Sequence, residues 1–237
     1  MAISITRAEI QRRLNNKHLF PFYALFILYY ILYTPFWSRP PVTFTAAFFK
    51  VLPVWALAGF VRLSAGEDLK ALLPKKDYHR FLMIGLLFSS LGDAVLVSIE
   101  NLFIPGMLLF SFAHIFYSLA IGPGADYSRL KSLFILGCIG SFLFLASGME
   151  GCVMQILVMV YSVLIFTVGW RATSKFEVDQ SYPSLFGCVG ILLFLFSDFI
   201  IGVNKWKFYV PFNEFIIMTT YYVGQLGIAL SADLSPA

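Results

Sequence analysis

The segment Phe81–Ile99 constrains the fold of this chain more than any other feature. It is apolar or small throughout except for one ionisable side chain, Asp93, and nineteen such residues are enough for one helical crossing of a bilayer. A charged group in hydrocarbon costs about 2.5–3.5 kcal/mol on insertion scales, so it normally faces a bundle interior or a wet cavity. The segment Ser184–Val203 repeats this arrangement with Asp198 behind Ser197. Two helices that each carry one acid at depth predict an intramembrane polar site.

The composition indicates the class of protein. Hydrophobic residues make up 59% of the 237 residues and charged residues only 13%, whereas soluble domains contain about 25% charged residues. We therefore expect an integral membrane protein that contacts the lipid bilayer. The net charge of +4 does not indicate a nucleic-acid partner, because the basic residues lie between apolar segments.

Eight apolar segments predict an all-α fold, a polytopic membrane helix bundle with eight transmembrane helices in one integral membrane domain, residues 1–237. The predicted spans are Leu19–Trp37, Val42–Val61, Phe81–Ile99, Phe103–Ile121, Leu130–Ser147, Cys152–Ala172, Ser184–Val203 and Phe212–Ala232.

The distribution of basic residues predicts the orientation. Thirteen of the 17 Lys and Arg residues fall on the side of the N-terminus and three on the opposite side. Because cytosolic loops are enriched in Lys and Arg, we expect both termini in the cytosol. The loops on the other side are very short, so function is expected within the bundle.

Metal-binding and cysteine motifs are weak in this sequence. Cys138, Cys152 and Cys188 are scattered and lack CxxC spacing, which is typical of small buried residues. The one conceivable metal set is His114 with Asp93 and Asp198 as a facial triad. No metal and no cofactor are expected.

Polar residues in five of the segments fall at similar depth. With ~1.5 Å of rise per residue, four of them lie ~14–21 Å from the cytosolic edge of a ~30 Å core, and the fifth lies somewhat nearer the cytosol. These residues are Lys50, Asp93, His114, Asp198 and Gln225. The band predicts a single polar cavity near the midplane.

Each of these residues also has a structural explanation. Lys50 could extend to the interface or pair with an aspartate, and His114 could be a neutral core histidine. Tyr221, Tyr222 and Gln225 could be packing residues or interhelical hydrogen-bonding groups.

A faint internal repeat is present. LLFSSLGD (Leu86–Asp93) and LLFLFSD (Leu192–Asp198) match when one residue is skipped. The two segments are four spans apart and run in the same direction. A 4+4 parallel duplication would place both acids at matching depth across a central interface.

The chain resembles the lysoplasmalogenases, called YhhN proteins in bacteria. The matching motifs run from the second span to the last: FKVLP at Lys50, GDAVL at Asp93, FAHIFYSLA at His114 and Tyr117, GWRA at Arg171, FSDFIIGVNK at Asp198 and Asn204, and TTYYVGQLGIALSA at Gln225.

This resemblance implies hydrolysis of the vinyl ether bond of a lysoplasmalogen, a lysophospholipid, to a fatty aldehyde and glycerophosphoethanolamine or glycerophosphocholine. It also implies location in the endoplasmic reticulum. Asp93 and Asp198 would be catalytic. Residues expected to bind substrate or water or to support the acids are Lys50, His114, Tyr117, Asn204, Tyr221, Tyr222 and Gln225.

The chemistry fits a pair of acids. Vinyl ethers hydrolyse when an acid protonates the alkene carbon, and water captures the resulting oxocarbenium ion. Glycoside hydrolases meet a similar cation with two carboxyl groups in different protonation states. The alternatives are a proton-coupled lysolipid transporter or scramblase, a metal-dependent membrane lipid hydrolase, and a diaspartyl intramembrane protease. Oligomeric state leaves no trace in the sequence.

Overall fold

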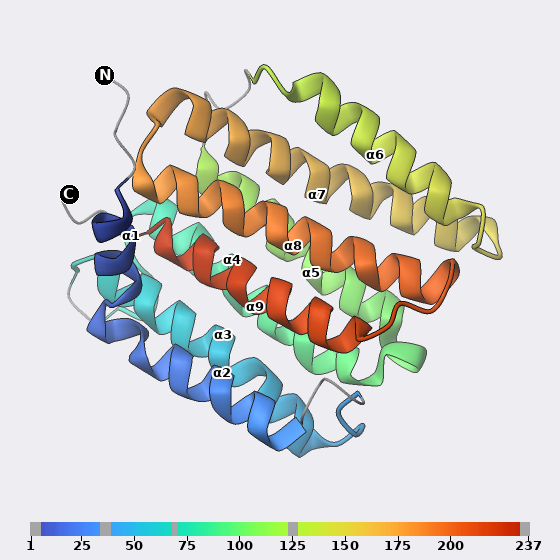
Figure 1. Cartoon of the computed structure of the whole chain (residues 1–237), viewed down its shortest axis with the longest axis horizontal. Coiled ribbons are helices and arrows are strands. Elements are labelled where there is room, and N and C mark those ends of the chain that lie inside the picture. The colour runs from blue at the N-terminus through green and yellow to red at the C-terminus, as the bar shows by residue number, and fades with distance from the viewer. Residues whose placement is uncertain (1–5, 34–38, 68–70, 123–127, 233–237) are drawn as a thin grey trace.

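A computed structural model describes residues 6–33, 39–67, 71–122 and 128–232, and these residues are helical apart from short turns and connections (Figure 1). The elements are α1 (Arg7–Leu14), η1 (Lys17–Leu19), α2 (Phe20–Tyr33), α3 (Phe44–Ser64), α4 (Asp77–Val95), η2 (Leu96–Ser98), α5 (Ile99–Ile121), α6 (Lys131–Ala146), α7 (Cys152–Asp179), α8 (Tyr182–Trp206) and α9 (Asn213–Leu230). The predicted all-helical class is confirmed.

Each of the eight apolar segments contains one helix from α2 to α9, but several boundaries differ from the prediction. α4 begins at Asp77, before the predicted Phe81, and ends at Val95 in the 3-10 turn η2. α5 begins at Ile99, so the loop expected next to Phe103 is helical, with a departure from helical geometry at Leu102. The predicted end of the first span, Trp37, lies outside the described residues.

Four helical stretches of the described chain are long and apolar enough to cross a membrane: Phe44–Ser64, Asp77–Ile121, Cys152–Asp179 and Tyr182–Trp206. The second contains α4, η2 and α5 together. Many large apolar side chains are exposed, for example Leu133, Leu136 and Leu143 on α6, as expected for a surface solvated by lipid. The chain is therefore an integral membrane protein, whereas eight crossings and the cytosolic termini stay predictions.

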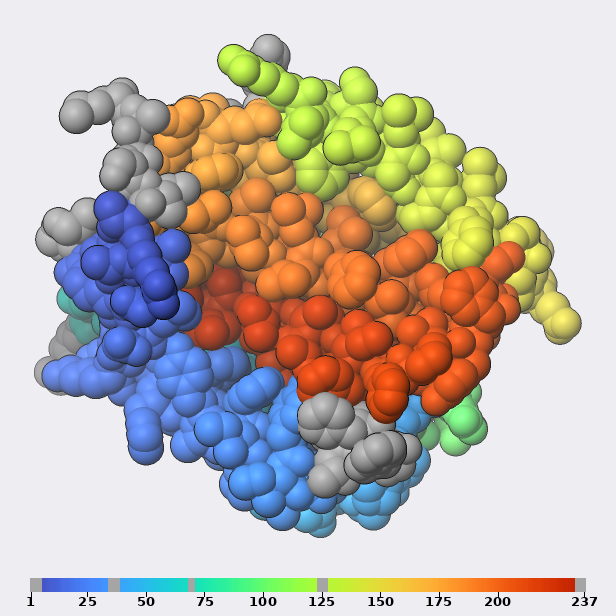
Figure 2. All heavy atoms as spheres, viewed as in Figure 1, coloured from blue at the N-terminus to red at the C-terminus, as the bar shows by residue number. Residues whose placement is uncertain are grey.

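The helices lie side by side along the long axis of the molecule (Figure 1). α8 packs mainly against α9 and α4 mainly against α5, and α3 contacts both α4 and α9. α8 and α9 occupy the centre of the face shown in Figure 2, with α2 and α6 on either side. The proposed 4+4 repeat is not tested by this packing and stays a prediction.

Glycines allow α8 and α9 to approach closely. A Cβ atom added at Gly190 would lie 2.6 Å from the carbonyl oxygen of Gly224 and 2.6 Å from the backbone nitrogen of Ile228. Small residues at such contacts are typical of membrane helix pairs, because van der Waals packing drives their association. This contact sets how α9, which carries Tyr221 and Gln225, is positioned beside α8.

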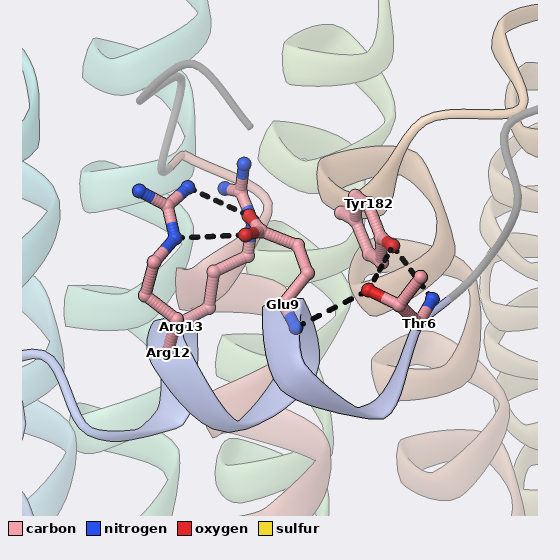
Figure 3. Close-up of polar contacts among 5 residues, drawn as sticks. All are labelled: Thr6, Glu9, Arg12, Arg13 and Tyr182. Carbon is pink, nitrogen blue, oxygen red and sulfur yellow. Dashed lines mark hydrogen bonds and ion pairs between the residues drawn. The ribbon is translucent and has the colours of Figure 1, made fainter.

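A hydrogen bond joins the N-cap residue of the short helix α1 to the beginning of α8 (Figure 3). The backbone N–H of Thr6 donates to the hydroxyl of Tyr182 at 2.8 Å, and Glu9 accepts from Arg12 and Arg13 at 2.7 Å each. The hydrogen bond from Arg12 keeps the pKa of Glu9 below its ordinary value. α1 and the start of α8 therefore meet at one end of the bundle.

Candidate functional site

Asp93 lies at the meeting point of α3, α4 and α9. Its side chain is buried, and the Tyr221 hydroxyl donates to its Oδ2 at 2.5 Å. Lys50 Nζ lies 4.0 Å from the Asp93 Oδ1. Tyr222 donates to the backbone carbonyl of Lys50 at 2.8 Å, which ties α9 to α3. Four predicted site residues are thus brought together. The pairing of Lys50 with an aspartate, the structural alternative to a role in binding substrate, is also present.

Asp198 forms a second group with side chains of α5 and α7. The Tyr161 hydroxyl donates to Asp198 Oδ2 in a short hydrogen bond. His114 Nε2 lies 3.0 Å from the Tyr161 oxygen and 3.8 Å from Asp198 Oδ2. His114 is therefore associated with one of the two acids, one of the roles expected for it.

Tyr161 is absent from the set of residues selected from the sequence. Its signal was a hydroxyl in the middle of the apolar segment Cys152–Ala172, next to Ser162. A tyrosine in a membrane helix is common enough that this signal carried little weight without its partners. Tyr161 can be identified as a site residue only from the packing of α7 against α8, which brings its hydroxyl to Asp198.

Aromatic rings contact both acid groups. The Phe194 ring centroid lies 4.9 Å from that of His114 and 5.3 Å from that of Tyr221. Phe110 packs on Phe194 at 5.7 Å. The two carboxyl groups bond to different tyrosines, Asp93 to Tyr221 and Asp198 to Tyr161. They form two half-sites rather than one shared hydrogen-bond pair.

Tyr117 and Gln225 form a third polar contact between α5 and α9. The Tyr117 hydroxyl donates to Gln225 Oε1 at 2.9 Å and lies 3.1 Å from the hydroxyl of Ser89 on α4. All three side chains are buried. Their contacts join α4, α5 and α9. These three helices carry Asp93, His114 and Tyr221, so the contacts help to hold both acid groups in position.

Asn204 lies apart from both acids at the end of α8. Its Oδ1 accepts from the backbone N–H of Val210 at 3.0 Å, which shapes the turn between α8 and α9. Asn204 and Lys50 both line a polar cavity of about 210 Å³ at this end of the bundle.

The donor set does not assemble the suggested metal triad. His114 lies with Asp198, whereas Asp93 lies with Lys50 and Tyr221. Among residues 6–33, 39–67, 71–122 and 128–232, no group of three or more His, Cys, Asp or Glu side chains could hold a metal ion. The three cysteines are not joined in disulfides.

An apolar cavity between α5, α6, α7 and α8 borders the second acid group. Asp198 and Tyr161 line it together with side chains such as Phe103, Leu145 and Phe199. A carboxyl group at the wall of an apolar cavity, joined to a phenol and an imidazole, can transfer protons to a substrate whose reacting bond adjoins an alkyl chain.

Comparison with known proteins finds relatives that are named lysoplasmalogenases. Lysoplasmalogenase TMEM86A from Homo sapiens is 35% identical over 224 residues, which cover 92% of this chain and 89% of the relative. Its Bos taurus counterpart is 34% identical over 222 residues with the same two coverages. Lysoplasmalogenase TMEM86B from Homo sapiens is 32% identical over 231 residues, 98% of this chain and 93% of the relative.

No solved structure matches this chain. The model of the YhhN family matches residues 45–232, a range that contains Lys50, Asp93, His114, Tyr161, Asp198 and the α9 tyrosines. This match confirms the resemblance expected from the sequence motifs. The chain belongs to the YhhN family.

Proposed function

We propose that this protein hydrolyses the vinyl ether bond of 1-alkenyl lysophospholipids within the membrane. The products are a fatty aldehyde and glycerophosphoethanolamine or glycerophosphocholine. The observation that carries the proposal is the acid group Asp198–Tyr161–His114 at the wall of the apolar cavity. The names of the relatives, which are lysoplasmalogenases, support it. The proposed location is the endoplasmic reticulum, with both termini in the cytosol.

Asp198 is the proposed general acid, because it is the carboxyl that lines the apolar cavity. The alkenyl carbons next to the ether oxygen occupy this cavity, and the rest of the chain stays in lipid. Asp198 gives its proton to the alkene carbon that does not carry oxygen, and the electron pair of the ether oxygen forms an oxocarbenium ion. Water adds to the cationic carbon and returns a proton to Asp198. The hemiacetal then separates into aldehyde and alcohol, so that one water is consumed.

Asp93 is the proposed second carboxyl of the reaction. Its position is held by Tyr221 and Lys50, and Phe194 contacts both Tyr221 and His114 of the other acid group. A fixed carboxylate stabilises a developing oxocarbenium ion and can orient the water that captures it. Tyr117 and Gln225 hold the helices that carry these groups and are positioning residues.

The proposal is tested with protein purified in detergent and a 1-alkenyl lysophosphoethanolamine in heavy water. We expect release of aldehyde that carries deuterium on the carbon next to the aldehyde group, because that carbon receives the acid's proton. The saturated 1-alkyl analogue has no alkene to protonate and should give no product. Authentic aldehyde incubated in the same buffer measures background exchange. Binding of the lipid without release of aldehyde would instead favour a transporter or scramblase.

Replacing Tyr161 with Phe should lower the turnover of the alkenyl lipid by about tenfold or more. The change removes the hydroxyl that bonds to Asp198 and contacts His114, and hydrogen bonds to charged groups contribute about 1.5–3 kcal/mol. Tyr30→Phe is the matched control, because it removes a tyrosine hydroxyl that bonds to Thr219 away from both acids. Equal turnover in the two variants would exclude a role for Tyr161 in proton transfer.

A further inference from the structure

The polar cavity at one end of the bundle is lined by charges of both signs. It lies where α4 is followed by α5 and α8 by α9, and it encloses about 210 Å³. Its polar lining consists of Arg39, Lys50, Lys205, Glu100, Glu214 and Asn204. A cavity with three cations and two carboxylates is suited to a ligand that itself carries both charges.

Two cations of this cavity form loose ion pairs, and the third lies over an aromatic ring. Arg39 Nε lies 3.7 Å from Glu214 Oε2, and Lys50 Nζ lies 4.0 Å from Asp93. Lys205 Nζ lies 4.8 Å from the centre of the Phe103 ring. The two ion-pair separations are longer than good charge-assisted hydrogen bonds, which measure about 2.7–2.9 Å. The cations therefore keep donors that an anionic group of a ligand can engage.

The polar cavity adjoins the apolar cavity beside Asp198. Leu96 and Ile201 line both cavities, and Ile201 lies one helical turn beyond Asp198 on α8. A molecule with one alkyl chain and one polar end can therefore occupy both spaces at once. The bond between the chain and the polar end would then lie near Asp198.

We propose that the polar cavity is a binding site for the zwitterionic phosphodiester–ammonium head group of a single-chain lipid, with the phosphate bound by Arg39, Lys50 and Lys205 and the ammonium by Glu100 and Glu214. This inference rests on the proposed function for its choice of lipid. Arg39 offers a planar fork of donors that matches phosphate oxygens, and the lysines add point charges. The two carboxylates repel a head group that is only anionic, so they select for the one that also carries an ammonium.

The test measures binding of lipids that the enzyme cannot cleave. Three saturated ethers are titrated into the detergent-purified protein: 1-alkylglycerophosphoethanolamine, 1-alkylglycerophosphomethanol, which lacks the ammonium, and 1-alkylglycerol, which lacks the head group. We expect the first to bind about tenfold or more tightly than the other two. Lys205→Glu should remove most of this advantage and leave the affinity for 1-alkylglycerol unchanged. Glu214→Gln should reduce the preference for the zwitterionic over the anionic lipid.

Lys207→Glu is the matched control. Lys207 is a neighbouring base that bonds to Ser147 and lies over Phe144, and it does not line the cavity. Equal affinity of the wild type for all three lipids would overturn the proposal, as would equal effects of the two lysine variants. Since no bond is cleaved, these outcomes are independent of the proposed hydrolysis. Aldehyde release without head-group preference would contradict only the head-group site.

Discussion

Asp198→Asn and Asp93→Asn should each lower aldehyde release from a 1-alkenyl lysophospholipid by about 10²–10⁴-fold, the usual contribution of a positioned acid or base. Asparagine has nearly the shape of aspartate and keeps an oxygen that accepts the hydrogen bond from Tyr161 or Tyr221. It cannot give a proton to carbon and carries no negative charge. The rate of aldehyde formation at saturating substrate measures the effect.

Asp179→Asn is the control for this pair. Asp179 ends α7, is exposed and pairs with Lys175 at 2.8 Å. In the part of the chain that the structure describes, it contacts no residue of either acid group. It should leave the rate unchanged. Elution of all three variants as monodisperse protein, together with binding of a saturated ether lipid, separates a chemical effect from misfolding. Wild-type rates in either Asp93→Asn or Asp198→Asn would refute the two-acid mechanism.

Gly190→Ala should destabilise the protein strongly. The added Cβ would lie 2.6 Å from backbone atoms of α9, and backbone cannot move aside as a flexible side chain can. Overpacking costs typically about 1–3 kcal/mol, and here the whole α8–α9 contact must open. The midpoint of thermal unfolding in detergent measures the loss. Because α9 carries Tyr221, the rate of aldehyde release should also fall, even at temperatures below the midpoint of unfolding.

Gly59→Ala is the matched control on α3. A Cβ at Gly59 meets no atom within 4 Å, and alanine favours helix over glycine by about 0.8–1.0 kcal/mol. The midpoint should therefore stay the same or rise. A Gly190→Ala protein as stable as Gly59→Ala would show that α8 and α9 do not pack as closely as the structure indicates.

The sequence by itself determined the class of the protein and the helical segments. Length and apolar content of each segment are local properties, so Phe44–Ser64 and Tyr182–Trp206 could be placed within a few residues. The isolated carboxyls Asp93 and Asp198 were also evident, because a charged group in an apolar segment is costly wherever the helix packs. The predicted ends of helices were less accurate. Hydropathy marks only the apolar part of a helix, whereas α4 begins earlier, at the polar residue Asp77.

Only the tertiary structure decided which polar groups meet. The rotation and depth of each helix follow from packing with neighbours, as at Gly190, and one sequence does not specify them. For this reason the polar residues form two half-sites that both contact Phe194, and Tyr161 is the partner of Asp198. The polar cavity has the same origin, because Arg39 and Glu214 are distant in the chain and adjacent only where the helix ends converge.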